Sequence, residues 1–327
     1  MVYVMKQSEI IGSEYTQHPV SAATINENDF PFMPAMSAEV CALAVIVAVE
    51  GPSYRRCGAA MVIDAAGRSW GNLSSGCIDR SVILNAKSAM QAGKTMRVRY
   101  GKGSPYWDVP LPCGGALDIQ IFPFPDKLQL NSVAQNLKAR KPAMLTLQED
   151  GVLAPYPTGM GLHLTILPQI RVVIFGTGLE TICFAELAMA AGCKVEIISP
   201  DPDVLTRFSW ASPLITNTWP TEISIDERTA IITFFHDHDR EPDILNAALA
   251  SSAFFIGSQG SFRAHKARCE TLRAHNCPEE NIERLTFPLG LIPSTRDPQT
   301  LGVSVLAHIL EKVAEAALTN NELALIQ

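Results

Sequence analysis

The sequence predicts an α/β protein in two parts: an N-terminal α+β domain, then a doubly wound domain built on a parallel sheet. Three observations predict this fold. The chain has 327 residues, 47% of them hydrophobic and 18% charged, which is enough for two sizeable cores. Short strand-like runs separated by glycine-rich turns fill the first third of the chain. From Gln169 onward, continuous apolar strands alternate with helical segments, as in parallel sheets covered by helices.

The expected domain boundaries follow changes in composition. Residues 1–36 are polar and mixed and are interpreted as an N-terminal extension. The cysteine-containing α+β domain is expected over 37–125, and proline-rich boundaries set off a connecting region over 126–168. The parallel-sheet domain is expected over 169–315, followed by a C-terminal tail over 316–327.

Charge and cysteine usage exclude several classes of protein. A formal net charge of -7 argues against nucleic acid or an anionic membrane as the main partner. The longest apolar run, 41–49, is too short to span a bilayer, and Glu9 and Glu14 interrupt the region where a secretory signal would be apolar. Eight cysteines without a CxxC pair resemble neither a zinc framework nor a disulfide scaffold, so we expect a cytoplasmic chain with reduced thiols.

The N-terminal domain is predicted from strands that end in turns. A helix is expected over 78–92, closed by Gly93, and the loop over 50–59 carries the adjacent arginines Arg55 and Arg56. These arginines either clamp a phosphate or pterin group or are simply solvated. The expected strands are 41–49, 60–64, 68–72, 95–100 and 116–122.

Two cysteines lie beside glycines at turns, in Ser74-Ser75-Gly76-Cys77 and in Pro112-Cys113-Gly114-Gly115. Because glycine has no side chain, the backbone at such turns can approach a ligand closely. Cys77 is expected at or just before a helix N-terminus, where the helix dipole favours the thiolate. We therefore predict that Cys77 and Cys113 handle a soft metal, a sulfur atom or a cofactor, although their spacing alone is no metal signature. Cys41, Cys183 and Cys193 are expected to be ordinary core residues.

The second half opens with the strand, glycine turn and helix of a Rossmann βαβ unit. The apolar strand 170–175 is followed by Gly176-Thr177-Gly178 and then by a helix. Thr181 replaces the third glycine of the fingerprint. Ser199 ends the second strand where an acid would bind the ribose hydroxyls, although Asp201 follows. These features leave two readings open, a nucleotide site and a scaffold without a nucleotide.

Two later segments follow strands at the carboxyl edge, where doubly wound sheets bind ligands. His236-Asp237-His238-Asp239 follows the expected strand 229–235, and it is either a metal site or a polar loop that caps a helix. Gly257-Ser258-Gln259-Gly260-Ser261 follows the expected strand 253–256, and it is either an anion-binding nest at a helix N-terminus or a bare turn.

Taken together, these motifs resemble the xanthine dehydrogenase accessory (XdhC/CoxI) family. In the first half, the resemblance is carried by Gly51–Ala59, Ser74–Asp79 and Cys113–Gly115. In the second half it is carried by Phe175–Gly178, His236–His238, Phe255–Ser261, Pro288–Leu291 and the helix over 298–310. The cysteine segments match the family pattern better than the nucleotide segments, where Leu179, Ser199 and Ile292 depart from it.

The resemblance implies a chaperone of the molybdenum cofactor with no turnover of its own. Such proteins bind molybdopterin cofactor as cargo, protect it while a cysteine desulfurase exchanges an oxo ligand for sulfur, and pass it to a molybdenum hydroxylase of the xanthine dehydrogenase type. They commonly form homodimers. On this resemblance Cys77 and Cys113 contact the metal, and Arg55 and Arg56 contact the phosphate.

The other residues implied as cofactor contacts are Gly76, Gly114, Gly115, Gly176, Gly178, His236, Asp237, Gly257, Gly260 and Ser261. Two alternatives remain open. One is an oxidoreductase that uses NAD(P) or another nucleotide, with Cys77 or Cys113 as a redox thiol. The other is a non-catalytic scaffold that only docks a partner enzyme.

Overall fold

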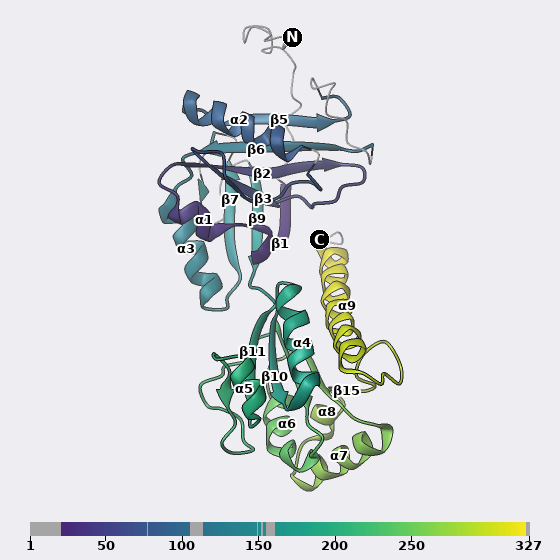
Figure 1. Ribbon diagram of the computed structural model, residues 1–327. Helices are drawn as coiled ribbons and strands as arrows, with labels where there is room; N and C mark the ends of the chain where they lie inside the picture. Colours follow the sequence, from purple (N-terminus) through teal and green to yellow (C-terminus); the bar gives the residue numbers. More distant parts are fainter. Residues whose placement is uncertain are drawn as a thin grey trace. The chain divides into compact units, whose positions relative to one another are not determined.

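A computed structural model of the chain describes residues 21–76, 78–104, 114–148, 150–151, 153–154 and 161–324. The chain divides into two compact units, Met1–Pro168 and Gln169–Gln327, which are described one at a time. The predicted fold class is confirmed, because antiparallel and mixed sheets form the first unit and an all-parallel sheet forms the second (Figure 1).

The first unit contains a five-stranded antiparallel sheet in the order β4-β3-β2-β6-β5. Helix α2 (Asp79–Ala92) packs across one face of it through Val82, Ala86 and Ala89, and ends at Gly93 in the left-handed conformation (Figure 1). Because both faces of the sheet are covered, its central strands are continuous apolar runs instead of alternating ones. The strands are β2 (Cys41–Glu50), β3 (Ala60–Asp64), β4 (Ser69–Gly71), β5 (Met96–Gly101) and β6 (Ala116–Pro123).

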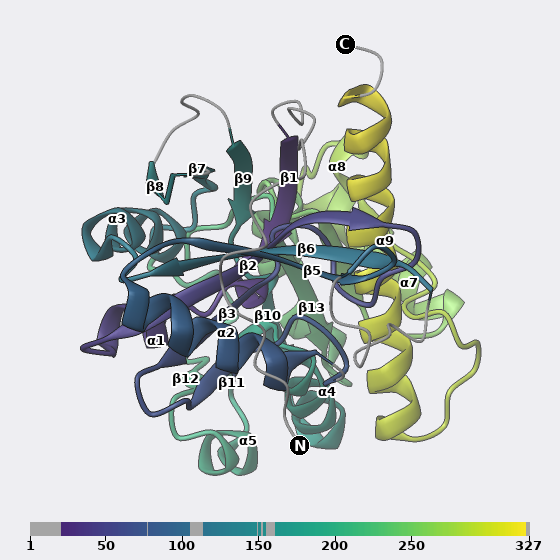
Figure 2. The same ribbon diagram turned by 90° about the horizontal axis from the view of Figure 1, so that it is seen from above.

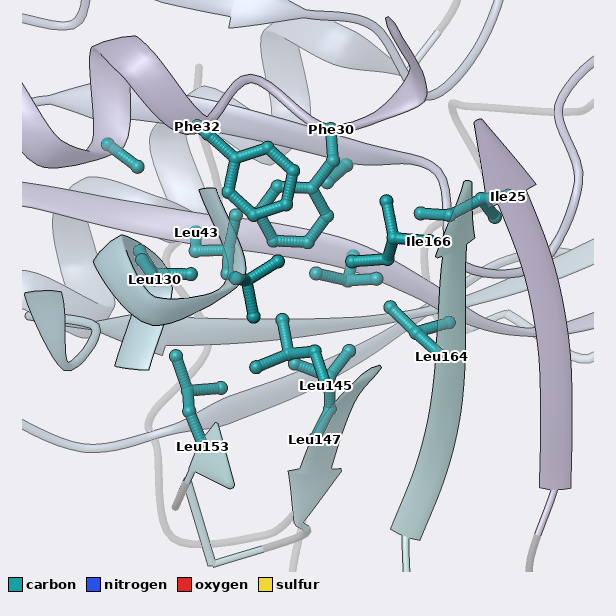
Figure 3. Close-up of a cluster of buried hydrophobic side chains, with 14 of the residues drawn as sticks. Ile25, Phe30, Phe32, Leu43, Leu130, Leu145, Leu147, Leu153, Leu164 and Ile166 are labelled. Carbon is teal, nitrogen blue, oxygen red and sulfur yellow. The ribbon is translucent and has the colours of Figure 1, made fainter. Parts of the chain in front are cut away.

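A second, four-stranded sheet and two helices cover the opposite face. Leu43 of β2 packs with Leu145, Leu164 and the stacked rings of Phe30 and Phe32 (Figure 3). The sheet has the order β1-β9-β7-β8, in which β1 runs parallel to β9. The elements are β1 (Ser21–Asn26), η1 (Glu27–Asp29), α1 (Phe32–Ser37), α3 (Lys127–Lys138), β7 (Ala143–Gln148), β8 (Leu153–Ala154) and β9 (Gly161–Leu167).

This layer is built from the segments that were expected to be an N-terminal extension and a connecting region. From residue 21 the extension supplies a strand and part of the core, since Ile25 and Phe30 are buried. The connecting region supplies α3 and three strands of the same layer. Sequence patterns missed this arrangement because β1 pairs with β9, which lies far along the chain.

The second unit is a six-stranded parallel sheet in the order β12-β11-β10-β13-β14-β15. Numbered within this unit, that is the order 3-2-1-4-5-6 of the Rossmann fold, with the switch point between β10 and β13. The strands are β10 (Arg171–Gly176), β11 (Lys194–Ser199), β12 (Ser212–Pro213), β13 (Thr229–Phe234), β14 (Phe255–Ser258) and β15 (Leu285–Thr286).

Helices cover both faces of this parallel sheet. One core lies beneath α6 and α7, and the other lies beneath α4 and α9. Helices α4 and α9 lie side by side (Figure 2). The helices are α4 (Gly178–Ala190), α5 (Pro202–Arg207), η2 (His238–Arg240), α6 (Pro242–Leu249), α7 (Phe262–Ala274), α8 (Glu279–Ile282) and α9 (Pro298–Ala324).

Two boundaries of the second unit differ from the sequence prediction. The strand expected over 253–256 runs instead over Phe255–Ser258, so Gly257 lies inside it. Helix α9 continues to Ala324, which places most of the expected C-terminal tail within a helix. Within the described part of the chain, no helix is long and apolar enough to cross a membrane.

Candidate functional site

The glycine- and cysteine-bearing loops of the first unit leave from one end of the five-stranded sheet. The end of β2 at Glu50 pairs with Ala116 at the start of β6, which in turn pairs with Gly101 at the end of β5. On the other side, the start of β3 pairs with Val45 and the end of β4 pairs with Met61. The antiparallel register therefore gathers at one end the loop over 51–59, the segment that leads into α2, and Gly114-Gly115.

Gly115 packs directly against the loop that follows β2. A Cβ atom on Gly115 would lie 2.5 Å from the carbonyl oxygen of Pro52 and 2.7 Å from that of Glu50, so no larger residue fits. Gly114 is in the left-handed region at φ 72°, with open space around its Cα. Two of the predicted motifs are thus in contact. Cys113 itself lies outside the described residues.

A hydrogen-bonded turn leads into α2. The Ser74 hydroxyl accepts from the N–H of Gly76 at 2.9 Å and donates to the Asp79 carboxylate at 2.9 Å. The N–H of Ile78, the N-cap residue of α2, also points to the Ser74 hydroxyl, at 3.4 Å. These bonds fix the backbone on both sides of position 77, and Gly76 adopts φ 104°, which residues with side chains rarely do. Cys77 itself lies outside the described residues.

The two adjacent arginines differ in their availability. The Arg55 guanidinium pairs with Asp29 of η1, with 2.9 Å between Nη2 and Oδ1, and its side chain is only 22% exposed. Arg56 is exposed and makes no ion pair with any residue that the structure describes. Arg56 is therefore the better placed of the two to meet an anion from solution.

An ionic network that the sequence reading missed lies at the same end of the sheet. Arg99 pairs with Glu50 and, at 3.2 Å, with the buried Asp118, which also pairs with Arg97 at 3.2 Å. Lys102 reaches Glu50 at 3.4 Å. Hydrogen bonds from Arg99 and Lys102 lower the pKa of Glu50 below its usual value. In the sequence, the alternation of arginines with apolar residues along β5 was the signal that could have revealed this network.

The six described cysteines all have a raised pKa, and burial is the main cause in each case. For Cys57, in the loop after β2, burial raises the pKa to about 11, and its thiol donates to the carbonyl of Ile46. Cys41 and Cys193 are buried, as predicted, and Cys183 is half-buried. Because the thiolate is the metal ligand, these six thiols are poorly suited to bind a metal at neutral pH.

The first glycine turn of the parallel sheet is built for packing. A Cβ on Gly176 would collide with the Thr181 hydroxyl and with the Phe234 carbonyl, and Thr181 is fully buried. Thr181 thus fills the space that the third glycine of a full fingerprint would leave open. The Ser199 hydroxyl, also buried, donates to the carbonyl of Gly176 at 2.7 Å.

Carboxylates surround the N-terminus of α4. Asp201 accepts a hydrogen bond from the N–H of Gly178 at 2.8 Å and from that of Asp203 at 2.9 Å, so both of its oxygens are engaged. Glu180 lies in the first turn of the same helix, with its carboxylate 3.8 Å from the ring of His236. Two negative charges there oppose a pyrophosphate, which a dinucleotide would place at this helix end.

The segment after β13 is a capped loop. His236 has a 72% exposed side chain, and the Asp237 carboxylate accepts from the N–H of Asp239, which caps η2. Of the two readings, the polar capping loop agrees with this geometry. Nowhere in the described ranges do three or more histidine, cysteine, aspartate or glutamate side chains gather as they would around a metal ion.

A buried ion pair that sequence reasoning missed lies between the carboxyl ends of β13 and β14. Glu241 is only 1% exposed in its side chain and pairs with Arg268 of α7 at 2.8 Å. Thr233 and Ser258, both buried, donate to the same carboxylate at 3.0 and 2.8 Å. His238 lies 3.2 Å from both partners of the pair. The predicted cofactor contacts Gly257, Gly260 and Ser261 lie in the same region, between β14 and α7.

Three predicted residues, one within β14 and two in the turn that follows it, have distinct local roles. Gly257 leaves space for Leu289, since a Cβ there would come within 2.5 Å of the leucine side chain. Gly260 lies over the Arg268 guanidinium, with a Cβ position 3.4 Å from Nη2. Ser261 is the N-cap of α7, and its hydroxyl accepts from the N–H of Ala264 at 3.2 Å.

Comparison with known proteins agrees with this arrangement. The family model described as the XdhC Rossmann domain matches residues 172–309, and that of the XdhC and CoxI family matches residues 35–101. The molybdenum cofactor insertion chaperone PaoD of Escherichia coli (strain K12) is 32% identical over 282 residues, which cover 84% of each chain. A probable xanthine dehydrogenase subunit of Bacillus subtilis (strain 168) is 24% identical over 315 residues, covering 84% of this chain and 93% of the relative.

A solved structure shares the fold. The crystal structure of a xanthine dehydrogenase from Bacillus halodurans matches with a TM-score of 0.71 at 19% identity, covering 87% of this chain and 95% of that one. The two family models match successive parts of the chain, one in each unit, and the resemblance seen in the sequence motifs is confirmed. The chain therefore belongs to the XdhC/CoxI family.

Proposed function

We propose that this chain is a molybdenum cofactor insertion chaperone, which binds the molybdopterin cofactor as cargo and delivers it to a molybdenum hydroxylase of the xanthine dehydrogenase type. The observation that carries the proposal is the 32% identity to a chaperone of that description over 84% of both chains. The chain itself performs no turnover in this account, because its task is to hold and release the cofactor.

The geometry of the first unit supports a cofactor site at one end of its five-stranded sheet. Gly76, the neighbour of Cys77, follows β4, which ends there. Gly114, the neighbour of Cys113, precedes β6, which begins there. Thiolate sulfur is a soft ligand that suits molybdenum. We assign the metal contacts to Cys77 and Cys113 and a phosphate contact to Arg56. Arg55 is a weaker candidate for a phosphate contact, because its guanidinium already pairs with Asp29.

Three further features belong to the same proposal. Sulfur from a cysteine desulfurase replaces an oxo ligand of the cofactor while the chaperone holds it. The chaperone works as a homodimer. Both steps, binding and delivery, take place in the cytoplasm. The sulfur exchange and the homodimer follow from the resemblance of the motifs to the family, and the cytoplasmic location follows from the cysteine usage of the sequence. Pull-down, light scattering and cell fractionation measure them directly.

Anaerobic purification followed by metal and pterin analysis tests the proposal. We expect the wild-type chain to carry molybdenum and a fluorescent pterin in similar amounts. Cys77→Ala and Cys113→Ala should each lose most of the metal, whereas the control Cys183→Ala, which removes a half-buried thiol of the second unit, should retain it. A wild-type chain without pterin, or metal content unchanged in both cysteine variants, would contradict the proposal.

The alternatives predict different purified material. A nucleotide-dependent oxidoreductase would carry stoichiometric NAD(P) and reduce it with a substrate, without pterin. The carboxylates of Asp201 and Glu180 at the N-terminus of α4 weigh against this reading. A docking scaffold would bind neither ligand but would still retain a molybdenum hydroxylase in a pull-down.

A further inference from the structure

We propose that the second unit binds a phosphate monoester at the turn between β14 and α7, where the buried Arg268 and the first N–H groups of α7 act as donors. This site lies two strands away from the glycine turn that a Rossmann fingerprint would use. The geometry of the second unit alone supports it, so it can be tested whether or not the chain carries molybdenum.

The first observation is a buried guanidinium with one group unused. The Arg268 side chain is only 4% exposed. Its Nε donates to Glu241 at 2.8 Å, and its Nη2 donates to the Gln259 carbonyl at 2.9 Å. Nη1 is buried and has no hydrogen-bond partner among the residues that the structure describes. A buried charged donor without a partner is costly and rare in folded proteins, so it points to a missing acceptor.

The second observation is where this guanidinium lies. Long side chains on a helix lean toward its N-terminus, so Arg268 reaches back beneath the turn that precedes α7. A Cβ on Gly260 would lie 3.7 Å from Nη1 and 3.0 Å from the Cβ of Ala264. The glycine therefore keeps the space above Nη1 free of side-chain atoms. Because Nη1 is buried, an anion that binds it has to enter through the turn at Gly260.

The third observation is the helix end itself. Ser261 uses its hydroxyl to cap the N–H of Ala264, which leaves the N–H groups of Phe262 and Arg263, the first two of α7, without a partner within the helix. The helix dipole favours an anion there. Arg263 is exposed and adds a positive charge in the first turn.

These donors match a phosphate monoester better than a carboxylate. Nη1 and two backbone N–H groups can each meet one of the three terminal oxygens of a phosphate, whereas a carboxylate offers only two. The Glu241 carboxylate lies beside Arg268, and its charge is offset by Arg268 and by donors from Thr233 and Ser258. The Phe262 ring, 71% exposed at the same helix end, offers a face on which a planar heterocycle of the ester can stack.

Phosphate titration of the full chain, followed by calorimetry and by phosphorus NMR line broadening, tests this site with inorganic phosphate as the probe. Wild type should bind it saturably. Gly260→Ala fills the space above Nη1. Arg268→Lys keeps the positive charge but removes the planar guanidinium and its Nη1 donor. Each variant should weaken binding by about tenfold or more. The control Arg273→Gln removes a charge near the exposed C-terminal end of the same helix and should leave binding unchanged.

Circular dichroism establishes that each variant is folded, and if Arg268→Lys is not, Gly260→Ala decides the outcome alone. Absence of saturable binding to wild type would overturn the proposal, and so would unchanged binding to folded Gly260→Ala. Competition then identifies the source of the phosphate. Displacement by a phosphorylated pterin assigns the site to the cofactor, and displacement by adenosine monophosphate assigns it to a nucleotide. Binding of inorganic phosphate that neither ester displaces would overturn the assignment to a monoester.

Discussion

Two turns at the same edge of the parallel sheet present opposite charges to a ligand. The turn between β10 and α4 has the Rossmann glycines, yet the Asp201 carboxylate occupies its free N–H and Glu180 stands beside it. The turn between β14 and α7 has less of the fingerprint, yet a buried arginine with an unused donor lies beneath it. Glycine spacing therefore indicates backbone shape, and the charges around the turn decide which ligand it can accept.

The largest expected effect comes from breaking the buried pair beneath the second turn. Glu241→Ala leaves the Arg268 charge buried without its partner, so it should lower the free energy of unfolding by about 3–5 kcal/mol. The matched change at the first turn, Glu180→Ala, removes a half-buried carboxylate that lies 3.8 Å from His236 and should cost about 0.5 kcal/mol or less. Urea unfolding followed by circular dichroism measures both. Equal losses would contradict the difference between the turns.

Replacing Gly176 or Gly260 by alanine should have different effects on phosphate binding. At Gly176 the added Cβ meets the Thr181 hydroxyl and a backbone carbonyl, so we expect a loss of stability of about 1–3 kcal/mol. At Gly260 the added Cβ meets a methyl group at 3.0 Å and the backbone has φ 155°, where a side chain is strained, so stability should fall there too, together with phosphate binding. Thermal unfolding and phosphate titration of both variants check this. Weakened phosphate binding to Gly176→Ala, or unchanged binding to Gly260→Ala, would count against it.

A smaller loss of stability is expected on removal of Asp201, whose carboxylate accepts a hydrogen bond from the Gly178 N–H at the first turn. Asp201→Ala removes a cap from α5 and the partner of the Gly178 N–H, which should cost about 1 kcal/mol. It also removes a negative charge from the N-terminus of α4, so a second, weak phosphate site should appear. Calorimetric stoichiometry reports this change. If the number of phosphate sites stays as in wild type, the Asp201 carboxylate is not what prevents phosphate from binding at this turn.

The smallest effect concerns a thiol near the cysteine loops. Because burial raises the pKa of Cys57 to about 11, only a minute fraction is thiolate at neutral pH. Its alkylation by iodoacetamide should be slow at pH 7 and should accelerate steadily as the pH rises toward 11. Peptide mass spectrometry after timed alkylation follows Cys57 beside Cys77 and Cys113. Fast labelling of Cys57 at pH 7 would show that the loop after β2 does not shield it.

The sequence predicted the parts of this fold whose signals are local. The apolar strands β10 and β13 and the helix that ends at Gly93 were found because their patterns lie within one short window. The strand β1 was missed because its partner β9 is distant in the chain, and its short polar surroundings resemble a loop.

The charged residues of the site were harder to predict for a physical reason. Arg268 looks like any arginine on an amphipathic helix, and only the fold shows that it is buried against Glu241. Likewise Arg55 was expected to contact a phosphate, but its pairing with Asp29 depends on η1, a segment interpreted as an extension. Asp201 was noticed after the second strand, yet its bond to Gly178 requires the three-dimensional arrangement of two βα turns.

Cofactor transfer tests the central claim most directly. The full chain, purified anaerobically with its pterin and molybdenum, is mixed with a molybdenum hydroxylase that lacks cofactor, and both are separated and assayed for metal and activity. We predict that molybdenum moves to the hydroxylase and that its activity appears faster than with the same amount of free cofactor. Metal that stays on the chain, or activation no faster than with free cofactor, would contradict a role in insertion.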